Sequence, residues 1–345
     1  MRVINKSSVG ETTKGRTMAQ PDRELALELV RATEVAALAA GRWMGNANKE
    51  AGDQAAVDGM RQMLNAVAMD GVVVIGEGEK DEAPMLFNGE RVGTGTPPEV
   101  DLAVDPIDGT RLLAEGRPGA IAMIAVAPRG TMFDPGPCVY MMKWVVGADA
   151  VGTIDIDAPV EDNLKAIARA KDTDVSNLTA IMLDRPRHEQ LANEVRAAGA
   201  RLRLIMDGDV GGAVQALLPD RPFDVLLGIG GTPEGVATAC AVRALRGEMV
   251  GRLWPRNDDE RQRAIDAGYD LDEALTTDRL VRSDNTFFVC TGVTPGELCD
   301  GVTYTRAGAT TESLVMRGRS GTVRNIQARH TAEKLARYDA IGHHH

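Results

Sequence analysis

Aromatic residues are scarce in this sequence: Phe, Tyr and Trp together make up 3 % of the 345 residues. The core must therefore be filled by Val, Leu, Ile, Ala and the 15 Met. The longest apolar runs, such as 120–127, are strand-sized, whereas a membrane-spanning helix needs about 20 residues. The polar segment 1–17 has no apolar stretch typical of a secretory signal. These absences exclude a membrane protein and predict a cytoplasmic globular one.

Histidine is also rare, and three of the five histidines stand at 343–345, where we interpret them as the remnant of an affinity tag. Only His188 and His330 remain, which excludes a histidine-based zinc site. The four cysteines form no CxxC pair. We therefore expect them to be small buried side chains in a reducing compartment rather than disulfides or metal ligands.

The charge balance is strongly acidic, with a formal net charge of −11 and no cluster of Lys and Arg. A surface of this sign repels nucleic acid, so we predict no nucleic-acid partner. If the protein binds phosphate esters, it needs divalent cations or placed arginines to overcome its own field.

The first half of the chain contains two predicted helices and several strands. Helical spacing of apolar residues predicts helices over 22–44 and 53–68, the second capped by Asp53. Strands are expected at 71–75, 102–104, 120–127 and 139–146. The first two strands each end on an acidic, glycine-bearing turn.

From about residue 162, helical and strand-like segments alternate, which is typical of a mixed or parallel sheet covered by helices. The expected order is helix 163–170, strand 179–183, helix 188–198, strand 202–206, helix 211–218, strand 223–229 and helix 235–245. The stretch 285–329 returns to strand-like pieces separated by glycine turns.

Five acidic residues form a candidate set: Glu77, Glu79, Asp105 and Asp108 in these turns, and Asp53 at the expected start of the second helix. If the strands before Glu77 and Asp105 are neighbours, their carboxylates converge at one edge of a sheet. Carboxylates that close cannot all stay ionised without cations between them. Mg²⁺ or Mn²⁺, which prefer oxygen ligands, are the ions such a site would hold. Acidic turns are often only solvated loops, so this pattern alone is not decisive.

The hexapeptide Asp-Pro-Ile-Asp-Gly-Thr at 105–110 resembles the signature of the lithium-sensitive, metal-dependent phosphatase superfamily. Further segments are similar to class II fructose-1,6-bisphosphatases: 48–57, 74–79, 81–86, 185–188, 207–210 and 228–235. The resemblance covers about 22–333. It implies an α/β fold of the αβαβα layered sandwich type found in sugar phosphatases. It also suggests a tail at 1–20, a metal-binding subdomain at 21–157, a substrate-binding subdomain at 158–335 and a tail with the tag remnant at 336–345.

The resemblance implies roles for individual residues. Asp53 and Glu77 match one metal position, and Asp105, Asp108 and Glu234 match a second. Thr110 matches the residue that activates the attacking water, supported by Lys49 and Glu79. Substrate contacts are implied for Asp108, Gly109, Thr110, Tyr140, Arg185, Pro186, Arg187, Asp207, Gly208, Asp209 and Gly231.

Simple chemistry agrees with several of these roles. If a helix begins at Thr110, its free N–H groups can bind phosphate, and Gly109 allows close approach. Thr232 is expected to cap the next helix, with Pro233 in its first turn. The bare backbone of the preceding glycines could admit an anion. Arg185 and Arg187, after a strand, suit a second phosphate.

The implied activity is hydrolysis of the 1-phosphate of fructose 1,6-bisphosphate, as in gluconeogenesis, by a homodimer or homotetramer. Sedoheptulose-1,7-bisphosphatase activity, alone or as a second specificity, is an open alternative. An inositol-phosphate phosphatase is disfavoured because the Trp-Asp pair usual there is missing: Val145 follows Trp144, and Pro255 follows Trp254. A non-catalytic sugar-phosphate sensor is disfavoured because the expected metal carboxylates and Thr110 are present. The glycines at 228–235 do not have the spacing of a dinucleotide-binding loop.

Overall fold

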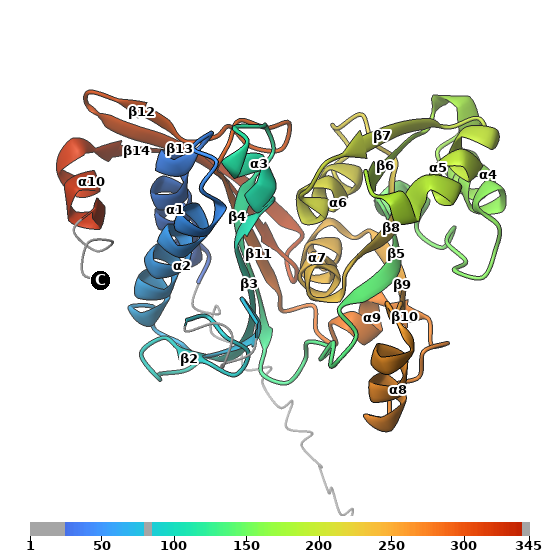
Figure 1. Ribbon diagram of the computed structural model, residues 1–345, viewed down its shortest axis with the longest axis horizontal. Helices are drawn as coiled ribbons and strands as arrows, with labels where there is room; N and C mark the ends of the chain where they lie inside the picture. Colours follow the sequence, from blue (N-terminus) through green and yellow to red (C-terminus); the bar gives the residue numbers. More distant parts are fainter. Residues whose placement is uncertain (1–24, 79–84, 340–345) are drawn as a thin grey trace, which may run out of the picture.

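Two β-sheets lie face to face across a pair of helices, and further helices cover their outer faces (Figure 1). The computed structural model describes residues 25–78 and 85–339. The layers follow the order helix, sheet, helix, sheet, helix, which is the αβαβα sandwich expected from the resemblance.

The first sheet has eight strands within the described ranges, in the order β12-β13-β11-β4-β3-β1-β2, with β14 paired to β13. β1 is parallel to β3, and the other pairs are antiparallel. The strands are β1 Asp70–Ile75, β2 Arg91–Val92, β3 Glu99–Asp108, β4 Ile121–Pro128, β11 Phe287–Gly292, β12 Thr303–Thr305, β13 Gly308–Arg317 and β14 Thr322–Thr331.

Helices α1 (Ala26–Ala40) and α2 (Lys49–Asn65) cover the outer face of this sheet. Leu29, Ala36 and Leu64 are among the residues that pack between these helices and the sheet. The helical spacing of apolar residues in α1 therefore predicts its buried face correctly.

The second sheet has six strands, again within the described residues, in the order β10-β9-β5-β8-β6-β7. β6 is parallel to both β7 and β8, whereas β5 runs antiparallel to β8 and β9. The strands are β5 Tyr140–Val146, β6 Thr179–Leu183, β7 Arg201–Ile205, β8 Val225–Gly231, β9 Glu248–Leu253 and β10 Leu275–Thr276.

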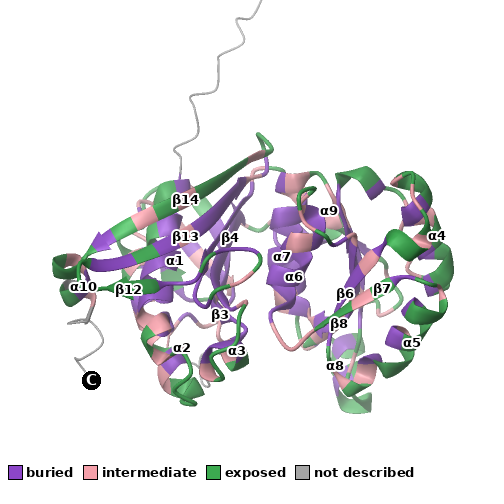
Figure 2. Ribbon diagram, turned by 90° about the horizontal axis from the view of Figure 1, so that it is seen from above, coloured by how far each residue is buried: buried purple, intermediate pink, exposed green. Residues whose placement is uncertain are grey.

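Between the sheets lie α6 (Asp209–Leu217) and α7 (Thr232–Leu245), which are rich in Gly, Ala and Val. Both helices are buried on nearly all sides (Figure 2), because small side chains let them fit between two sheets. α4 (Val160–Ala170) and α5 (Glu189–Ala197) cover the outer face of the second sheet. The remaining helices are α3 Thr110–Ala114, α8 Asp258–Asp266, α9 Thr277–Leu280, α10 Ala332–Asp339 and the 3-10 turns Gly41–Trp43, Ala148–Ala150, Val175–Asn177 and Pro186–His188.

The structure corrects two predicted helix caps. α2 begins at Lys49, and the side chain of Asn48 accepts a hydrogen bond from the N–H of Ala51 at 3.1 Å. Asp53 therefore lies one turn inside the helix rather than at its cap. α7 begins at Thr232 itself after Gly231, and the Thr232 side chain makes no capping hydrogen bond.

Sheet membership differs from the expected subdomain boundary near 157. β5 precedes that boundary and lies in the second sheet, whereas β11 to β14 follow it and lie in the first. The chain therefore crosses between the sheets more than once, and the subdomain limits stay a prediction. α10 also continues to Asp339, where a tail was expected from 336. The expected tail at 1–20 lies outside the described residues.

No helix in the described part of the chain is long and apolar enough to cross a membrane. All four cysteines are buried as free thiols, which confirms their predicted role as small core side chains.

Candidate active site

One cavity of about 400 Å³ opens where the carboxyl ends of parallel strands from both sheets meet. Almost every residue proposed from the sequence lines it: Lys49, Asp53, Glu77, Asp105, Asp108, Gly109, Thr110, Tyr140, Arg185, Arg187, Asp207, Gly208, Asp209, Gly231 and Glu234. Pro186 does not line the cavity and instead begins the 3-10 turn after Arg185. Glu79 lies outside the described residues.

The first sheet contributes carboxylates at the ends of two adjacent strands. Glu77 comes directly after β1, and Asp105 and Asp108 belong to the end of β3. β3 continues through Asp108, beyond the predicted strand, and its pairing with β4 shifts between Asp105 and Asp108. This irregularity bends the strand end and lets both aspartates line the cavity.

Helix α2 adds Lys49 and Asp53, which are four residues apart and therefore lie on one face of the helix. The Lys49 ammonium stabilises the charged form of Asp53, but burial has the larger effect and raises the pKa of that carboxyl. α2 thus brings one cation and one carboxylate to the rim of the cavity.

The acidic residues destabilise one another's charged forms. Burial and the neighbouring Asp53 raise the pKa of Glu77 to about 7. The pKa of Asp105 is raised by burial and by repulsion from Asp108, Glu77 and Glu234. Part of Asp105 faces the cavity, whereas protein surrounds it elsewhere. Such mutual repulsion is what bound cations would relieve.

The lining has seven carboxylates but only three cationic side chains among the described residues. An excess of four negative charges cannot accept a phosphate ester without cations, so the donor set fits divalent metal ions. As the side chains stand, however, no three His, Cys, Asp or Glu of the described residues form a group that could hold an ion. The carboxylates would therefore have to rotate toward a cation as it enters.

Thr110 begins α3 directly after Gly109, as expected. Its hydroxyl donates to the carbonyl of Ile107 at 3.2 Å, which leaves the oxygen lone pairs available. Gly109 has φ +94°, a conformation that favours glycine, and its position places Thr110 at the cavity wall.

From the second sheet, the turn before α6 supplies Asp207, Gly208 and Asp209. Gly208 adopts a left-handed conformation that turns the chain into α6. The N–H of Gly211 donates to Asp108 at 3.1 Å, which joins the start of α6 to the end of β3. The pKa of Asp108 is raised by burial and by Asp209.

The two arginines after β6 are held by fixed partners. Arg185 pairs with Asp207 at 3.0 Å and donates to the carbonyl of Met206. Arg187 donates from Nε and Nη2 to the carbonyl of Ile229 at 3.1 and 2.9 Å, and its guanidinium lies 4.7 Å from the Tyr140 ring centroid. Both side chains thus form a preorganised cationic wall beside an aromatic ring.

The glycines before α7 make room for side chains. A Cβ on Gly231 would overlap the carboxylate of Glu234, and one on Gly230 would overlap that of Asp209. From the sequence, this bare backbone is predicted to admit an anion directly. The structure instead places carboxylates against it, with Glu234 half-buried and its Oε2 atom shielded from solvent without a hydrogen-bond partner in the part of the chain that the structure describes.

Two buried residues near the cavity were not assigned a role from the sequence. The N–H of Ile229 donates to His188 Nε2 at 2.7 Å, so the Nδ1–H donates to the carbonyl of Leu183, also at 2.7 Å. His188 thus ties the end of β6 to β8. Lys143 in β5 forms an ion pair with Asp209, which lines the cavity. A lone charged residue in the apolar stretch 140–146 was the available signal for it.

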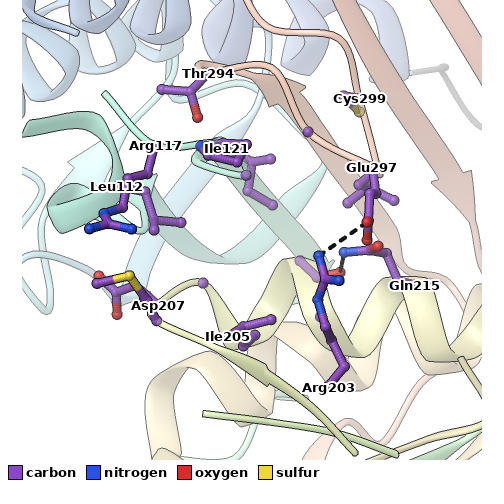
Figure 3. A pocket seen from close by; sticks show the side chains of 18 of the residues that line it. Leu112, Arg117, Ile121, Arg203, Ile205, Asp207, Gln215, Thr294, Glu297 and Cys299 are labelled. Carbon is purple, nitrogen blue, oxygen red and sulfur yellow. Dashed lines mark hydrogen bonds and ion pairs between the residues drawn. The ribbon is translucent and has the colours of Figure 1, made fainter. Parts of the chain in front are cut away.

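A second, smaller cavity of about 240 Å³ adjoins the first and shares Asp207 and Gly208 with it (Figure 3). Its lining includes Leu112, Ile121 and Ile205, and the ion pair between Arg203 and Glu297 (3.2 Å) borders it. Its carboxylates and guanidinium groups balance in number. The excess of carboxylates is therefore a property of the first cavity.

The layered fold and the acidic cavity are those of a sugar phosphatase, and comparison with known proteins agrees. The family model for bacterial fructose-1,6-bisphosphatase, glpX-encoded, matches residues 23–330. The class 2 fructose-1,6-bisphosphatase of Haemophilus influenzae is 45 % identical over 327 residues, covering 91 % of this chain and 98 % of that protein. Fructose-1,6-bisphosphatase 1 class 2 of Escherichia coli K12 is 45 % identical over 325 residues, covering 90 % and 96 %. The chain belongs to the glpX-encoded fructose-1,6-bisphosphatase family.

Proposed function

We propose that this protein hydrolyses the 1-phosphate of fructose 1,6-bisphosphate, releasing fructose 6-phosphate and inorganic phosphate, with Mg²⁺ or Mn²⁺. The observation that carries the proposal is one cavity that joins seven carboxylates, Thr110 and the two arginines that follow β6. Membership of the family supports the same activity.

The metal ligands proposed are Asp53 and Glu77 for one position and Asp105, Asp108 and Glu234 for another. Divalent cations there would offset the phosphate charge and bind the attacking and leaving oxygens. The raised pKa values of Glu77 and Asp105 support this assignment, because both carboxylates lack a cation that would favour their charged forms.

Thr110 is proposed to orient the attacking water. Its hydroxyl already donates to the carbonyl of Ile107, so its lone pairs can accept a hydrogen bond from water. Water oxygen bonds to phosphorus, the bond from phosphorus to the C1 oxygen breaks, and that oxygen takes up a proton. Lys49 and Glu79 are proposed to support this step.

The remote phosphate is proposed to bind at Arg185 and Arg187, beside Tyr140. Asp207, Gly208, Asp209 and Gly231 would contact the sugar, with Gly109 close to the reacting phosphate. Holding the non-reacting phosphate in a preorganised cationic site fixes the reacting one, so binding energy lowers the barrier. Pro186 would act only by setting the geometry between the two arginines.

No observation favours sedoheptulose 1,7-bisphosphate over the fructose substrate. We further propose that the protein is a cytoplasmic homodimer or homotetramer that acts in gluconeogenesis. Light scattering after size-exclusion chromatography would measure the assembly state.

Phosphate release from fructose 1,6-bisphosphate should be measured with Mg²⁺, Mn²⁺ or EDTA for the wild type and for Thr110→Ala. We expect turnover only with metal, and a loss in kcat of about 10²- to 10⁴-fold in the variant. Thr303→Ala, an exposed threonine in β12, is the matched control and should retain full activity. Sedoheptulose 1,7-bisphosphate is tested in parallel. Absence of turnover on every bisphosphate with either metal would contradict the proposal.

A further inference from the structure

Lys143 is a buried cation in the middle of the second sheet. It lies in β5, between β8 and β9, with its side chain only 2 % exposed. The other residues of this strand are Tyr, Met, Trp and Val. Removing an ammonium group from water is unfavourable, and only a partner of opposite charge offsets that cost. A lysine at this position therefore needs a partner that explains it.

That partner is Asp209, at the start of α6. Lys143 Nζ lies 2.7 Å from Asp209 Oδ2, and 3.4 Å from the carbonyl oxygen of Gly231, to which it donates. Asp209 Oδ2 has no hydrogen-bond partner in the described part of the chain, so charge attraction holds the pair. Among the described residues, no other cation forms an ion pair with Asp209.

Gly230 leaves the space that this ion pair occupies. A Cβ on Gly230 would overlap Asp209 Oδ2 and lie 3.0 Å from Lys143 Nζ. Any side chain at residue 230 would therefore displace the pair. The absence of a side chain there preserves the contact between β5 and α6.

Lys143 also acts on the charge of the site. Asp209 raises the pKa of both Asp108 and Glu234, whereas Lys143 lowers that of Glu234. At the first sheet, no buried lysine among the residues that the structure describes acts in this way on Asp105 or Glu77. Asp209 thus has a buried counter-charge within the protein, whereas burial and repulsion from other carboxylates dominate at Asp105 and Glu77.

We propose that Lys143 is a positioning residue for substrate binding: its ammonium fixes the carboxylate of Asp209 toward the cavity and supplies the counter-charge of Asp209, which therefore needs no bound cation of its own. Resting on the proposed function, this assigns Asp209 the role of accepting a hydrogen bond from a sugar hydroxyl. The carboxylate oxygen not paired with Lys143 is the one available for that hydroxyl.

The test compares Lys143→Met, which keeps the length of the side chain without its charge, with Asp209→Asn and the double variant. We expect Lys143→Met to raise KM for fructose 1,6-bisphosphate by about tenfold or more, with a smaller change in kcat. The double variant should have the KM of Asp209→Asn, because the lysine acts through that carboxylate. Lys171→Met, which removes a partly exposed lysine paired with Asp149 and Asp224, is the control and should leave KM unchanged.

Binding of Mn²⁺, followed by electron paramagnetic resonance, gives a readout independent of turnover. Lys143→Met should bind Mn²⁺ more tightly or bind an additional ion, because Asp209 and Glu234 then lack their counter-charge. The double variant should bind as the wild type does. If the wild type releases no phosphate, the proposed function fails, but this titration still tests Lys143.

A folded Lys143→Met variant with wild-type KM and wild-type Mn²⁺ binding would overturn the inference. If that variant does not fold, the double variant, which has no unpaired buried charge, is compared with Asp209→Asn. Equal KM values then support the inference, and a further rise of about tenfold in the double variant overturns it.

Discussion

Two regions of this molecule bury carboxylates, and they do so in opposite ways. In the active-site cavity, Asp105 is repelled by Asp108 and Glu77, and Glu77 is repelled by Asp53. In the outer part of the first layer, Glu34 of α1 is only 5 % exposed, accepts a hydrogen bond from Thr311 and lies 3.9 Å from His330. The first cluster is incomplete without an added cation, whereas the second is closed.

The partners of Glu34 form one chain of hydrogen bonds. Lys334 lies 3.0 Å from His330 Nδ1, and because an ammonium can only donate, Nε2 of the neutral ring carries the proton. That nitrogen lies 2.8 Å from the hydroxyl of Thr311, which in turn donates to Glu34 at 3.4 Å. Burial and Lys334 lower the pKa of His330 to about 4, which keeps the ring neutral.

The difference teaches that burial and raised pKa values do not by themselves mark a functional site. Burial raises the pKa of Glu34 as it does that of Glu77. The two sites differ in their exposure to solvent and in their balance of charges. The cavity around Glu77 is open to solvent and has more carboxylates than cationic side chains. Unpaired charge facing a cavity, rather than buried charge, predicts where ions and substrate bind.

The largest expected effect comes from Asp105→Asn. Removing one proposed ligand should lower kcat/KM by about 10³-fold or more, because the remaining carboxylates hold the cation poorly. The metal-free variant should nevertheless be at least as stable as the wild type, because a repelled buried charge has been removed. Calorimetric melting with EDTA, together with phosphate release, measures both effects.

The control for this substitution is Asp220→Asn, on the surface, which should change neither activity nor melting temperature. A large loss of metal-free stability in Asp105→Asn would show that the aspartate is held by internal partners. The contrast with the Glu34 cluster would then disappear.

The pH dependence of metal-free stability is the next effect. Glu77 binds its proton more tightly in the folded state (pKa about 7) than in the unfolded state (4.5). Folding stability in EDTA should therefore fall as the pH rises from 4.5 to 7, by about 3 kcal/mol at most. Urea unfolding at several pH values measures this slope.

Glu77→Gln should reduce the fall of metal-free stability with rising pH. Adding Mn²⁺ to the wild-type protein at pH 8 should restore the stability that it loses in EDTA. His330 contributes in the other direction, because its lowered pKa gives stability that is lost as the pH falls from 6.5 to about 4. An equal change of metal-free stability between pH 6 and 8 in the wild type and in Glu77→Gln, a comparison in which the contribution of His330 cancels, would contradict the assignment.

Much of the site could be predicted because its residues follow strand ends. Glu77 and Asp105 come after apolar runs that can only be buried strands, and parallel pairing brings such ends together. The cap at Asn48 was missed because Asp53 is an equally good capping residue by type, and only backbone geometry distinguishes them.

Other features depend on pairing between distant segments. β11 returns to lie beside β4, with 158 residues between the paired Phe287 and the end of β4 at Pro128. No local pattern encodes that choice, because an apolar strand fits either sheet. Lys143 was missed for a related reason: its partner Asp209 is on another element, brought near only by the packing of α6 on β5.

The smallest effect expected is that of Thr311→Val, which breaks the closed cluster without changing side-chain shape. His330 Nε2 and Glu34 would each lose a partner, at a cost of about 2 kcal/mol in unfolding free energy. Because the cluster lies outside the cavity, kcat and KM should stay within about twofold of the wild type. Thr310→Val, the exposed neighbour on β13, is the matched control and should unfold as the wild type does. Loss of activity in Thr311→Val at full folding would mean that the closed cluster communicates with the cavity, and the two regions would no longer be independent.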